Sequence, residues 1–169
     1  MVCALIAIKN ALARFLEWLV IVGMAVLVLA VVWQVVSRKV LGMPSSWSEE
    51  LARMVLVWIS LLGASVAYAR KAHLGVDYAV GKLDHRSQAM VALLVHVLVG
   101  VFAAAVLVYG GWIIVERTLA VRQSLPALGI QMGYVYLALP LSGVFFILFA
   151  AEGIVECLSQ WRAPLPREE

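Results

Sequence analysis

The chain has 169 residues, of which 64% are hydrophobic and only 14% are charged. Soluble domains average about 45–50% apolar and about 25% charged residues, so this composition predicts a membrane protein with no room for a globular catalytic domain. The formal net charge of +3 does not indicate nucleic acid, because Lys and Arg lie in short segments between apolar stretches, as topology signals do. Cys3 and Cys157 stand near opposite ends with no CxxC pattern, which predicts neither a metal site nor a disulfide framework.

Residues 1–14 mix apolar and basic side chains and are too short to span a bilayer. Leu5, Ile8 and Leu12 fall at helical spacing, and Lys9 lies off that face. This pattern suits a short helix that lies in the membrane interface, and a frayed terminus is the alternative.

Four apolar stretches follow, each long enough to cross a hydrocarbon core of about 30 Å. We predict helices over 15–40, 47–70, 88–116 and 133–156, forming one all-α membrane domain over residues 1–169. The first stretch is not a cleaved signal, because it exceeds the usual signal core of about 7–15 residues and a basic segment follows it.

Four spans place both termini on the same side of the membrane. With the N-terminus inside, eight basic residues lie inside: Lys9, Arg14, Arg70, Lys71, Lys82, Arg86, Arg162 and Arg167. Five lie outside: Arg38, Lys39, Arg53, Arg117 and Arg122. The positive-inside rule therefore predicts that both termini are cytoplasmic.

Small residues mark where membrane helices approach other helices, because lipid supplies no hydrophobic drive for association. The second span carries such a stripe: Ser60, Gly63, Ala64 and Ala67. Similar stripes occur in any helix bundle, so a purely structural role is the alternative. Trp58 lies near the middle of the same span, away from the membrane edges, and we expect it to pack against another helix.

The second span begins with charged residues. The segment Ser46–Glu49 matches the S-x-x-E capping box of a helix start. Glu49 and Arg53 are one turn apart, and Glu50 is also within reach of Arg53. Three interpretations of this trio stay open: an ion pair at the membrane edge, a contact to a partner subunit, and an ion or proton site.

The second span ends in a charged cluster of Arg70, Lys71, His73 and Asp77. Cations suit the C-terminal end of a helix, and the spacing of His73 and Asp77 allows a hydrogen bond between them. Simple positive-inside anchoring is the alternative.

The segment 123–133 joins the third and fourth spans and contains Pro126 and two glycines. It is too apolar for an ordinary aqueous loop, which predicts a docking surface or a re-entrant packing segment, with a tight turn as the alternative. Pro140 should kink the fourth span or leave a carbonyl that a neighbouring group must satisfy.

Two isolated ionisable residues could indicate other functions. Glu17 could serve as a proton-coupling carboxylate, but an ion pair with Arg14 is favoured. His96 could suggest haem, but no second histidine lies within a span, so we expect a packed or interfacial histidine. Nucleophile, phosphate-loop and paired-acid motifs are absent, so we predict no enzyme activity, cofactor or metal.

Six groups of residues carry a resemblance to a known family. In chain order they are Arg38, Trp47–Arg53, Val57–Trp58, Gly63–Ala64, Arg70–Asp77 and Met132–Gly143. Together they resemble the small membrane subunit, called the Q subunit or DctQ family, of tripartite ATP-independent periplasmic (TRAP) transporters. Lys39 and Gln131 depart from the residues that are frequent in the family.

The resemblance implies a bacterial or archaeal inner-membrane system. In such systems a periplasmic binding protein, the P subunit, delivers an organic acid to a large sodium-driven elevator subunit, the M subunit. The small subunit is then a non-enzymatic scaffold for uptake, with membrane lipids as further partners. A self-contained proton-coupled multidrug exporter using Glu17, and a redox anchor holding haem or quinone, are the alternatives.

On the scaffold hypothesis, ten residues form the large-subunit interface: Arg38, Trp47, Glu49, Glu50, Arg53, Trp58, Ser60, Gly63, Ala64 and Ala67. The cytoplasmic-edge cluster is Arg70, Lys71, His73 and Asp77. The candidate contacts to the binding protein are Pro126, Gln131, Met132 and Tyr134.

Overall fold

The computed structural model describes residues 2–70 and 85–162, and these are helical apart from short connections. The elements are α1 (Val2–Val40), α2 (Ser46–Ala69), α4 (His85–Phe102), the π-helical η1 (Ala103–Gly110), α5 (Gly111–Ala120), α6 (Met132–Tyr136) and α7 (Ala138–Arg162). Within these described residues, four stretches are long and apolar enough to cross a membrane. The four-span, all-α prediction is therefore confirmed.

The N-terminal segment is not a helix of its own. Helix α1 runs without a break from Val2 to Val40, so the prediction of a separate interfacial helix before residue 15 is wrong. Residues 1–14 contain no Pro or Gly, and a helix that is already nucleated extends at little cost through such a segment.

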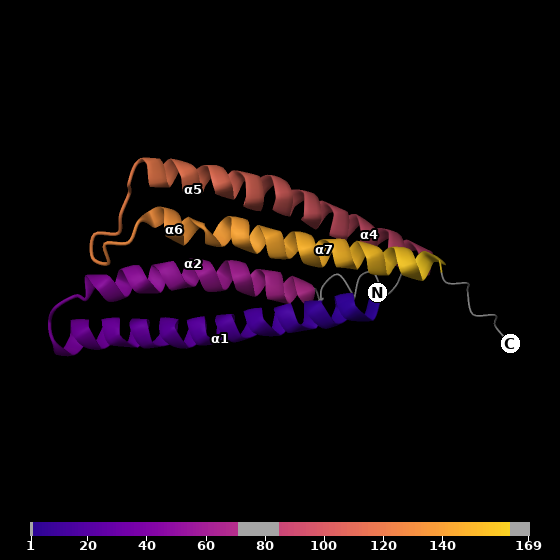
Figure 1. Cartoon of the computed structure of the whole chain (residues 1–169). Helices are drawn as coiled ribbons and strands as arrows, with labels where there is room; N and C mark the ends of the chain where they lie inside the picture. Colours follow the sequence, from indigo (N-terminus) through magenta and orange to yellow (C-terminus); the bar gives the residue numbers. More distant parts are fainter. Residues whose placement is uncertain (1, 71–84, 163–169) are drawn as a thin grey trace.

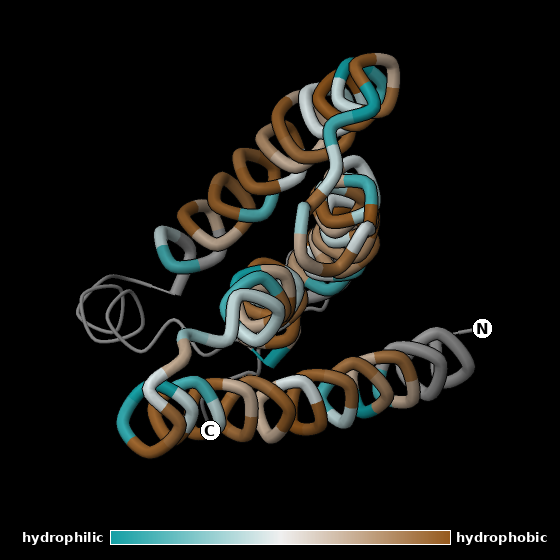
Figure 2. Tube along the Cα trace, turned by 90° about the vertical axis from the view of Figure 1, so that its left-hand side faces the viewer, coloured by the Kyte–Doolittle hydropathy of each residue, from teal (hydrophilic) through white to brown (hydrophobic). Residues whose placement is uncertain are grey.

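The helices lie side by side in the order α1, α2, α7 and the α4–η1–α5 span (Figure 1). Helices α2 and α7 are the inner ones, because 22% and 39% of the residues in their most apolar windows are buried, against 6% for α1 and for the third span. Seen from the end that carries the α1–α2 and α5–α6 connections, the helices consist mostly of apolar residues (Figure 2). Many of their large apolar side chains are exposed, so much apolar surface is left for lipid or a partner.

Both described ends of the chain lie at one end of the bundle, where α1 begins and α7 ends (Figure 1). This agrees with an even number of spans. The cytoplasmic position of that end stays a prediction from the distribution of basic residues.

Helices α1, α2 and α7 share the buried core. Its members are Ala13, Leu16, Leu62, Tyr68, Ala69, Phe149 and Ala150. Helices α1 and α2 approach closely beside this cluster, since a Cβ atom on Gly23 would lie only 2.5 Å from Cγ2 of Ile59. Close backbone contact of this kind drives helix association in lipid.

The third span is continuous from His85 to Ala120 and is longer than the predicted 88–116. Its middle part, η1, has π-helical hydrogen bonding that the sequence pattern did not predict. This part packs against α7 at Gly143, where a Cβ atom would lie 2.8 Å from both Leu107 and Val108 side chains.

The fourth span is interrupted between α6 and α7, at Leu137. Pro140 has no backbone N–H to donate to the carbonyl of Tyr136, one turn earlier, so the hydrogen-bond ladder breaks there. The predicted distortion by Pro140 is confirmed.

The start of α2 differs in register from the predicted capping box. Ser45, not Ser46, takes the N-cap position, and its side chain makes no capping hydrogen bond. Instead the hydroxyl of Ser48 donates to the Ser45 carbonyl at 2.9 Å. The Ser46–Glu49 capping box is therefore wrong, because the helix begins one residue earlier and the Glu49 carboxylate is engaged elsewhere.

Candidate functional site

One side of α2 is left uncovered by the described part of the chain. Six exposed residues recur there every three or four positions: Glu49, Arg53, Leu56, Ser60, Ala64 and Ala67. At one end Arg53 donates a hydrogen bond to Glu49 at 3.0 Å, and both side chains are more than half exposed. Toward the other end the stripe consists of small residues, which let a neighbouring helix approach closely. We call these six residues the α2 stripe.

The exposed face of α7 has a different character. Its residues are mostly large and aliphatic: Leu141, Val144, Leu148, Ala151, Val155 and Leu158. Such a face suits lipid chains, whereas the small and polar α2 stripe suits another helix. The α7 face is therefore suited to contact lipid, and the α2 stripe is suited to contact a helix of another protein.

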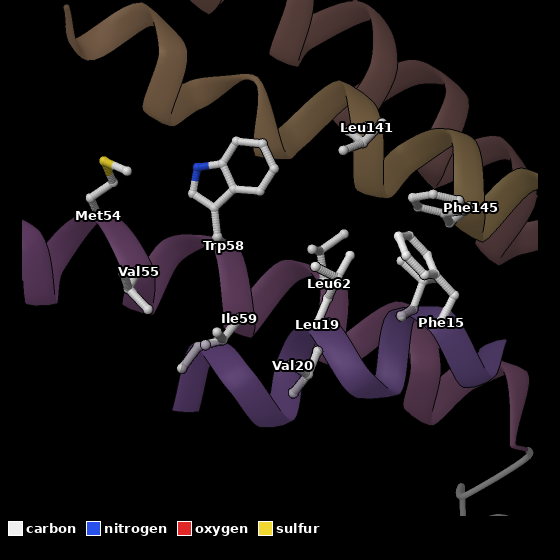
Figure 3. A pocket seen from close by; sticks show the side chains of 12 residues that line it. Phe15, Leu19, Val20, Met54, Val55, Trp58, Ile59, Leu62, Leu141 and Phe145 are labelled. Carbon is white, nitrogen blue, oxygen red and sulfur yellow. The ribbon is translucent and has the colours of Figure 1, made fainter. Parts of the chain in front are cut away.

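Five of the ten predicted interface residues do not belong to the α2 stripe: Arg38, Trp47, Glu50, Trp58 and Gly63. Gly63 is half-buried against α1, where a Cβ atom would lie 3.8 Å from Val20. Trp58 lines a groove on another side of α2 (Figure 3). Arg38 and Trp47, near the α1–α2 connection, are exposed and lie at the same end of the bundle as Glu49.

Glu50 anchors a distant loop. Its two carboxylate oxygens accept hydrogen bonds from the backbone N–H of Ala127 at 3.0 and 3.2 Å, and one also accepts from Leu128 at 3.0 Å. The pair that the sequence suggested between Glu50 and Arg53 is not formed, because the fold brings these two loop amides to the carboxylate. Glu50 thereby ties the start of α2 to the α5–α6 connection.

The α5–α6 connection is a compact turn. An antiparallel bridge joins Ser124 to Gln131, and the N–H of Leu125 donates to the Ile130 carbonyl at 2.8 Å. Leu125, within this turn, is only 6% exposed. Gly129 adopts a φ of +67°, a conformation that favours glycine. The tight turn, one of the predicted alternatives, is the structure observed.

The predicted binding-protein contacts differ in exposure. Pro126 and Tyr134 are exposed, whereas Gln131 and Met132 are half-buried. Only the first two therefore present most of their side chains outward.

Glu17 pairs with Arg70 across two helices. The guanidinium donates two hydrogen bonds to the carboxylate, from Nε at 2.5 Å and from Nη2 at 2.8 Å. The expected pair with Arg14 is thus replaced, because α1 and α2 are antiparallel and the end of α2 lies beside the start of α1. The hydrogen bonds to Glu17 raise the pKa of Arg70. Lys71, His73 and Asp77 lie outside the described residues.

His96 is packed, as predicted, and sits between three helices. Its Nδ1 is 2.6 Å from the hydroxyl of Tyr68 on α2, and Gly153 of α7 lies against the ring. Phe146 also packs against Tyr68, with 5.6 Å between the ring centroids. Within residues 2–70 and 85–162, no group of three or more His, Cys, Asp or Glu side chains could hold a metal ion.

The contact between Gly153 and His96 gives a stability prediction. A methyl group at Gly153 would lie 2.5 Å from Cε1 of His96 and 2.7 Å from both ring nitrogens. We expect Gly153→Ala to cost about 1–3 kcal/mol in the free energy of unfolding, as overpacking does, because the ring can move away only by straining its bond to Tyr68. Thermal unfolding in detergent measures this. Gly100→Ala is the control, since its methyl would lie at an ordinary 3.6 Å from Ala150; equal melting temperatures for the two variants would contradict the prediction.

Helices α1, α2 and α7 surround an apolar groove of about 450 Å³ (Figure 3). All twelve lining residues are apolar: Phe15, Leu16, Leu19, Val20, Gly23, Met54, Val55, Trp58, Ile59, Leu62, Leu141 and Phe145. The α2 residues that line the groove and the residues of the α2 stripe are about half a helical turn apart around the helix axis. The two surfaces therefore lie on opposite sides of α2.

Comparison with known proteins decides the family. Residues 27–160 match the model of the DctQ component of tripartite ATP-independent periplasmic transporters. The chain belongs to the DctQ family. It is 31% identical over 131 residues to the sialic acid TRAP transporter small permease protein SiaQ of Vibrio cholerae, covering 78% of this chain and 74% of SiaQ.

Two longer relatives contain a matching part. The isethionate TRAP transporter permease protein DctMQ of Oleidesulfovibrio alaskensis is 28% identical over 137 residues, which cover 77% of this chain but 21% of DctMQ. The sialic acid TRAP transporter permease protein SiaT of Haemophilus influenzae is 34% identical over 73 residues, covering 41% of this chain and 12% of SiaT.

This DctQ chain is therefore a small permease subunit of a TRAP transporter, a multi-pass inner-membrane protein and a transport component, not an enzyme. The resemblance drawn from the sequence is confirmed. Sequence reasoning missed Tyr68 as the partner of His96 and the loop amides as partners of Glu50, because contacts between residues far apart in the chain leave no local pattern.

Proposed function

We propose that this DctQ chain is the scaffold of a sodium-coupled TRAP transporter that imports an organic acid, packed against the large M subunit. The α2 stripe carries this proposal, since it combines small residues with a charged pair on a helix that the chain itself leaves uncovered. DctMQ and SiaT each hold a part similar to this chain within one longer permease, which supports a close partnership between small and large parts. Sialic acid and isethionate, named for these relatives, are acids, and the family resemblance supports sodium coupling.

A second contact is proposed for the α5–α6 connection. We infer that the periplasmic binding protein, the P subunit, docks on the exposed Pro126 and Tyr134, and that the half-buried Gln131 and Met132 contribute a smaller part of the contact. The ordered turn and its anchor on Glu50 support this contact, because a preformed surface loses less conformational entropy on binding. In the orientation predicted by the basic residues, this turn faces the periplasm.

Co-purification tests the scaffold proposal. The chain should be expressed together with the neighbouring genes, tagged alone, and recovered in a mild detergent. We expect a large multi-span membrane protein to be recovered at a one-to-one ratio. Recovery of this chain alone, as a homodimer, would contradict the scaffold and favour the small exporter.

Glu17 separates these two functions. In the scaffold, its carboxylate only pairs with Arg70 at the membrane edge, so we expect Glu17→Gln to leave substrate uptake by the reconstituted complex within about twofold of the unchanged protein, as exposed ion pairs contribute little. Uptake of labelled substrate into proteoliposomes measures the effect. A proton-coupled exporter would lose its activity with the same substitution, because the carboxylate would carry the proton.

A further inference from the structure

Arg122 closes helix α5 in a backbone conformation that usually belongs to glycine. Helix α5 ends at Ala120, and Arg122 has a φ of +51°, the only positive φ of a non-glycine residue in the described part of the chain. Its N–H donates to the Leu119 carbonyl at 3.0 Å, and the N–H of Gln123 donates to the Thr118 carbonyl at 3.4 Å. These two hydrogen bonds form a Schellman motif, whose left-handed position favours glycine because a Cβ atom is unfavourable there. An arginine is thus less suited to this turn than a glycine would be.

Closing the helix does not account for the arginine. A cation does interact favourably with the C-terminal end of a helix dipole, but Arg117 already supplies one in the last turn of α5. The side chain of Arg122 is exposed, and it forms no ion pair with any other described residue. Non-glycine residues in strained backbone conformations cluster at functional sites. The Arg122 guanidinium is therefore available to a partner.

Helix α5 carries Arg122 out of the hydrocarbon. Glu116 and Arg117 are exposed, and the apolar layer ends before them because charged side chains are unfavourable in hydrocarbon. From Glu116 to Ala120 the helix rises about 6 Å, which matches the thickness of one headgroup layer, roughly 5–7 Å. Arg122 follows Ala120 and lies at the outer boundary of that layer. A water-soluble protein can reach it there, whereas lipid phosphates lie nearer to the level of Arg117.

The end of the bundle that carries Arg122 has an excess of basic residues. The ends of α1 and α5 and the start of α2 lie together there (Figure 1). Among the described residues of this end, five are basic and three are acidic: Arg38, Lys39, Arg53, Arg117 and Arg122, against Glu49, Glu50 and Glu116. Such a surface attracts an acidic partner. A guanidinium can bind a carboxylate through two parallel hydrogen bonds.

We propose that Arg122 is a docking residue for the periplasmic binding protein and binds a carboxylate on its surface. The inference rests on the proposed function, because it names one contact within the proposed docking on the α5–α6 connection. Arg122 stands at the start of that connection, and the carbonyl of the next residue, Gln123, accepts a hydrogen bond from the Met132 N–H at 2.8 Å. The backbone on both sides of Arg122 is thus held in place before the partner arrives, which lowers the entropy lost on binding.

Binding of the partner tests this contact. The complex of this chain with its large subunit is reconstituted in lipid nanodiscs and immobilised, and the purified binding protein from the neighbouring gene is passed over it. We expect Arg122→Gln to raise the Kd about three- to tenfold at low salt, mainly through slower association. The difference should shrink at high salt, because salt screens exposed charges. Arg117→Gln is the control, since it removes the same charge from the same helix nearer the membrane, and it should bind normally.

Two further variants separate docking from helix closure. Arg122→Gly removes the charge and also relieves the backbone strain, so the protein should melt no lower than the unchanged one while the binding protein associates as weakly as with Arg122→Gln. Arg122→Lys keeps the charge and should retain most of the association rate. If Arg122 only closed the helix, Arg122→Gly would bind the partner normally.

Three results would overturn the contact. One is unchanged binding in Arg122→Gln or Arg122→Gly together with weaker binding in Tyr134→Ala, which would leave the docking on the α5–α6 connection in place without Arg122. Another is loss of the large subunit or of co-purifying anionic phospholipid in Arg122→Gln with an unchanged Kd for the binding protein, since one of these would then be the ligand. If the unchanged complex does not bind the binding protein, or neither Tyr134→Ala nor any Arg122 variant weakens binding, the proposed docking fails as well.

Discussion

Ala64→Phe is expected to reduce the recovery of the large subunit with this chain about tenfold or more. Ala64 lies within the α2 stripe between Ser60 and Ala67, and its side chain is exposed. Close approach of a partner helix at this point depends on small side chains, because lipid provides no hydrophobic drive that would compensate for a gap. The benzyl group of the introduced phenylalanine would keep the partner helix away from Ser60 and Ala67 as well as from position 64. The measurement is a pull-down from co-expressing cells, with both proteins quantified.

Ala151→Phe is the matched control for this change. Ala151 is also an exposed alanine, but it lies on the aliphatic face of α7, where a larger apolar side chain only displaces lipid. We expect normal recovery of the large subunit with this variant and little change in the melting temperature of either. Equal recovery with Ala64→Phe and Ala151→Phe would show that the partner does not pack on the α2 stripe.

Glu50→Ala is expected to release the α5–α6 connection. The substitution leaves the amides of Ala127 and Leu128 without their carboxylate acceptor, and hydrogen bonds to a charged group contribute about 1.5–3 kcal/mol. Hydrogen exchange of these two amides should therefore become about 10- to 100-fold faster. If the binding protein docks on this turn, uptake should fall while the complex with the large subunit stays assembled.

Glu49→Ala provides the comparison at the neighbouring position. Glu49 makes an exposed pair with Arg53 one turn away, and such pairs contribute about 0.3–0.5 kcal/mol. The loop amides should exchange at their original rate in this variant. Unchanged exchange in Glu50→Ala would show that the turn holds its shape without the carboxylate.

Part of the candidate interface could be predicted from helical spacing. Ser60, Ala64 and Ala67 follow the repeat of one helix face and are exposed together. Trp58 could have been excluded by the same argument, since two residues correspond to about 200° around a helix and place it far from Ser60. The packing of Gly63 against α1 could not be predicted, because it depends on where α1 crosses α2.

The sequence by itself determined the membrane class, the four spans and the family. Apolar length decides the spans, because a backbone in lipid must satisfy its hydrogen bonds within each helix. The tertiary structure alone decided the partners of the polar groups: Arg70 for Glu17, the Ala127 and Leu128 amides for Glu50, and Tyr68 for His96. These partners depend on which helix ends are brought together, and the local pattern of residues does not encode that. The same holds for the apolar groove, which exists only where three helices meet.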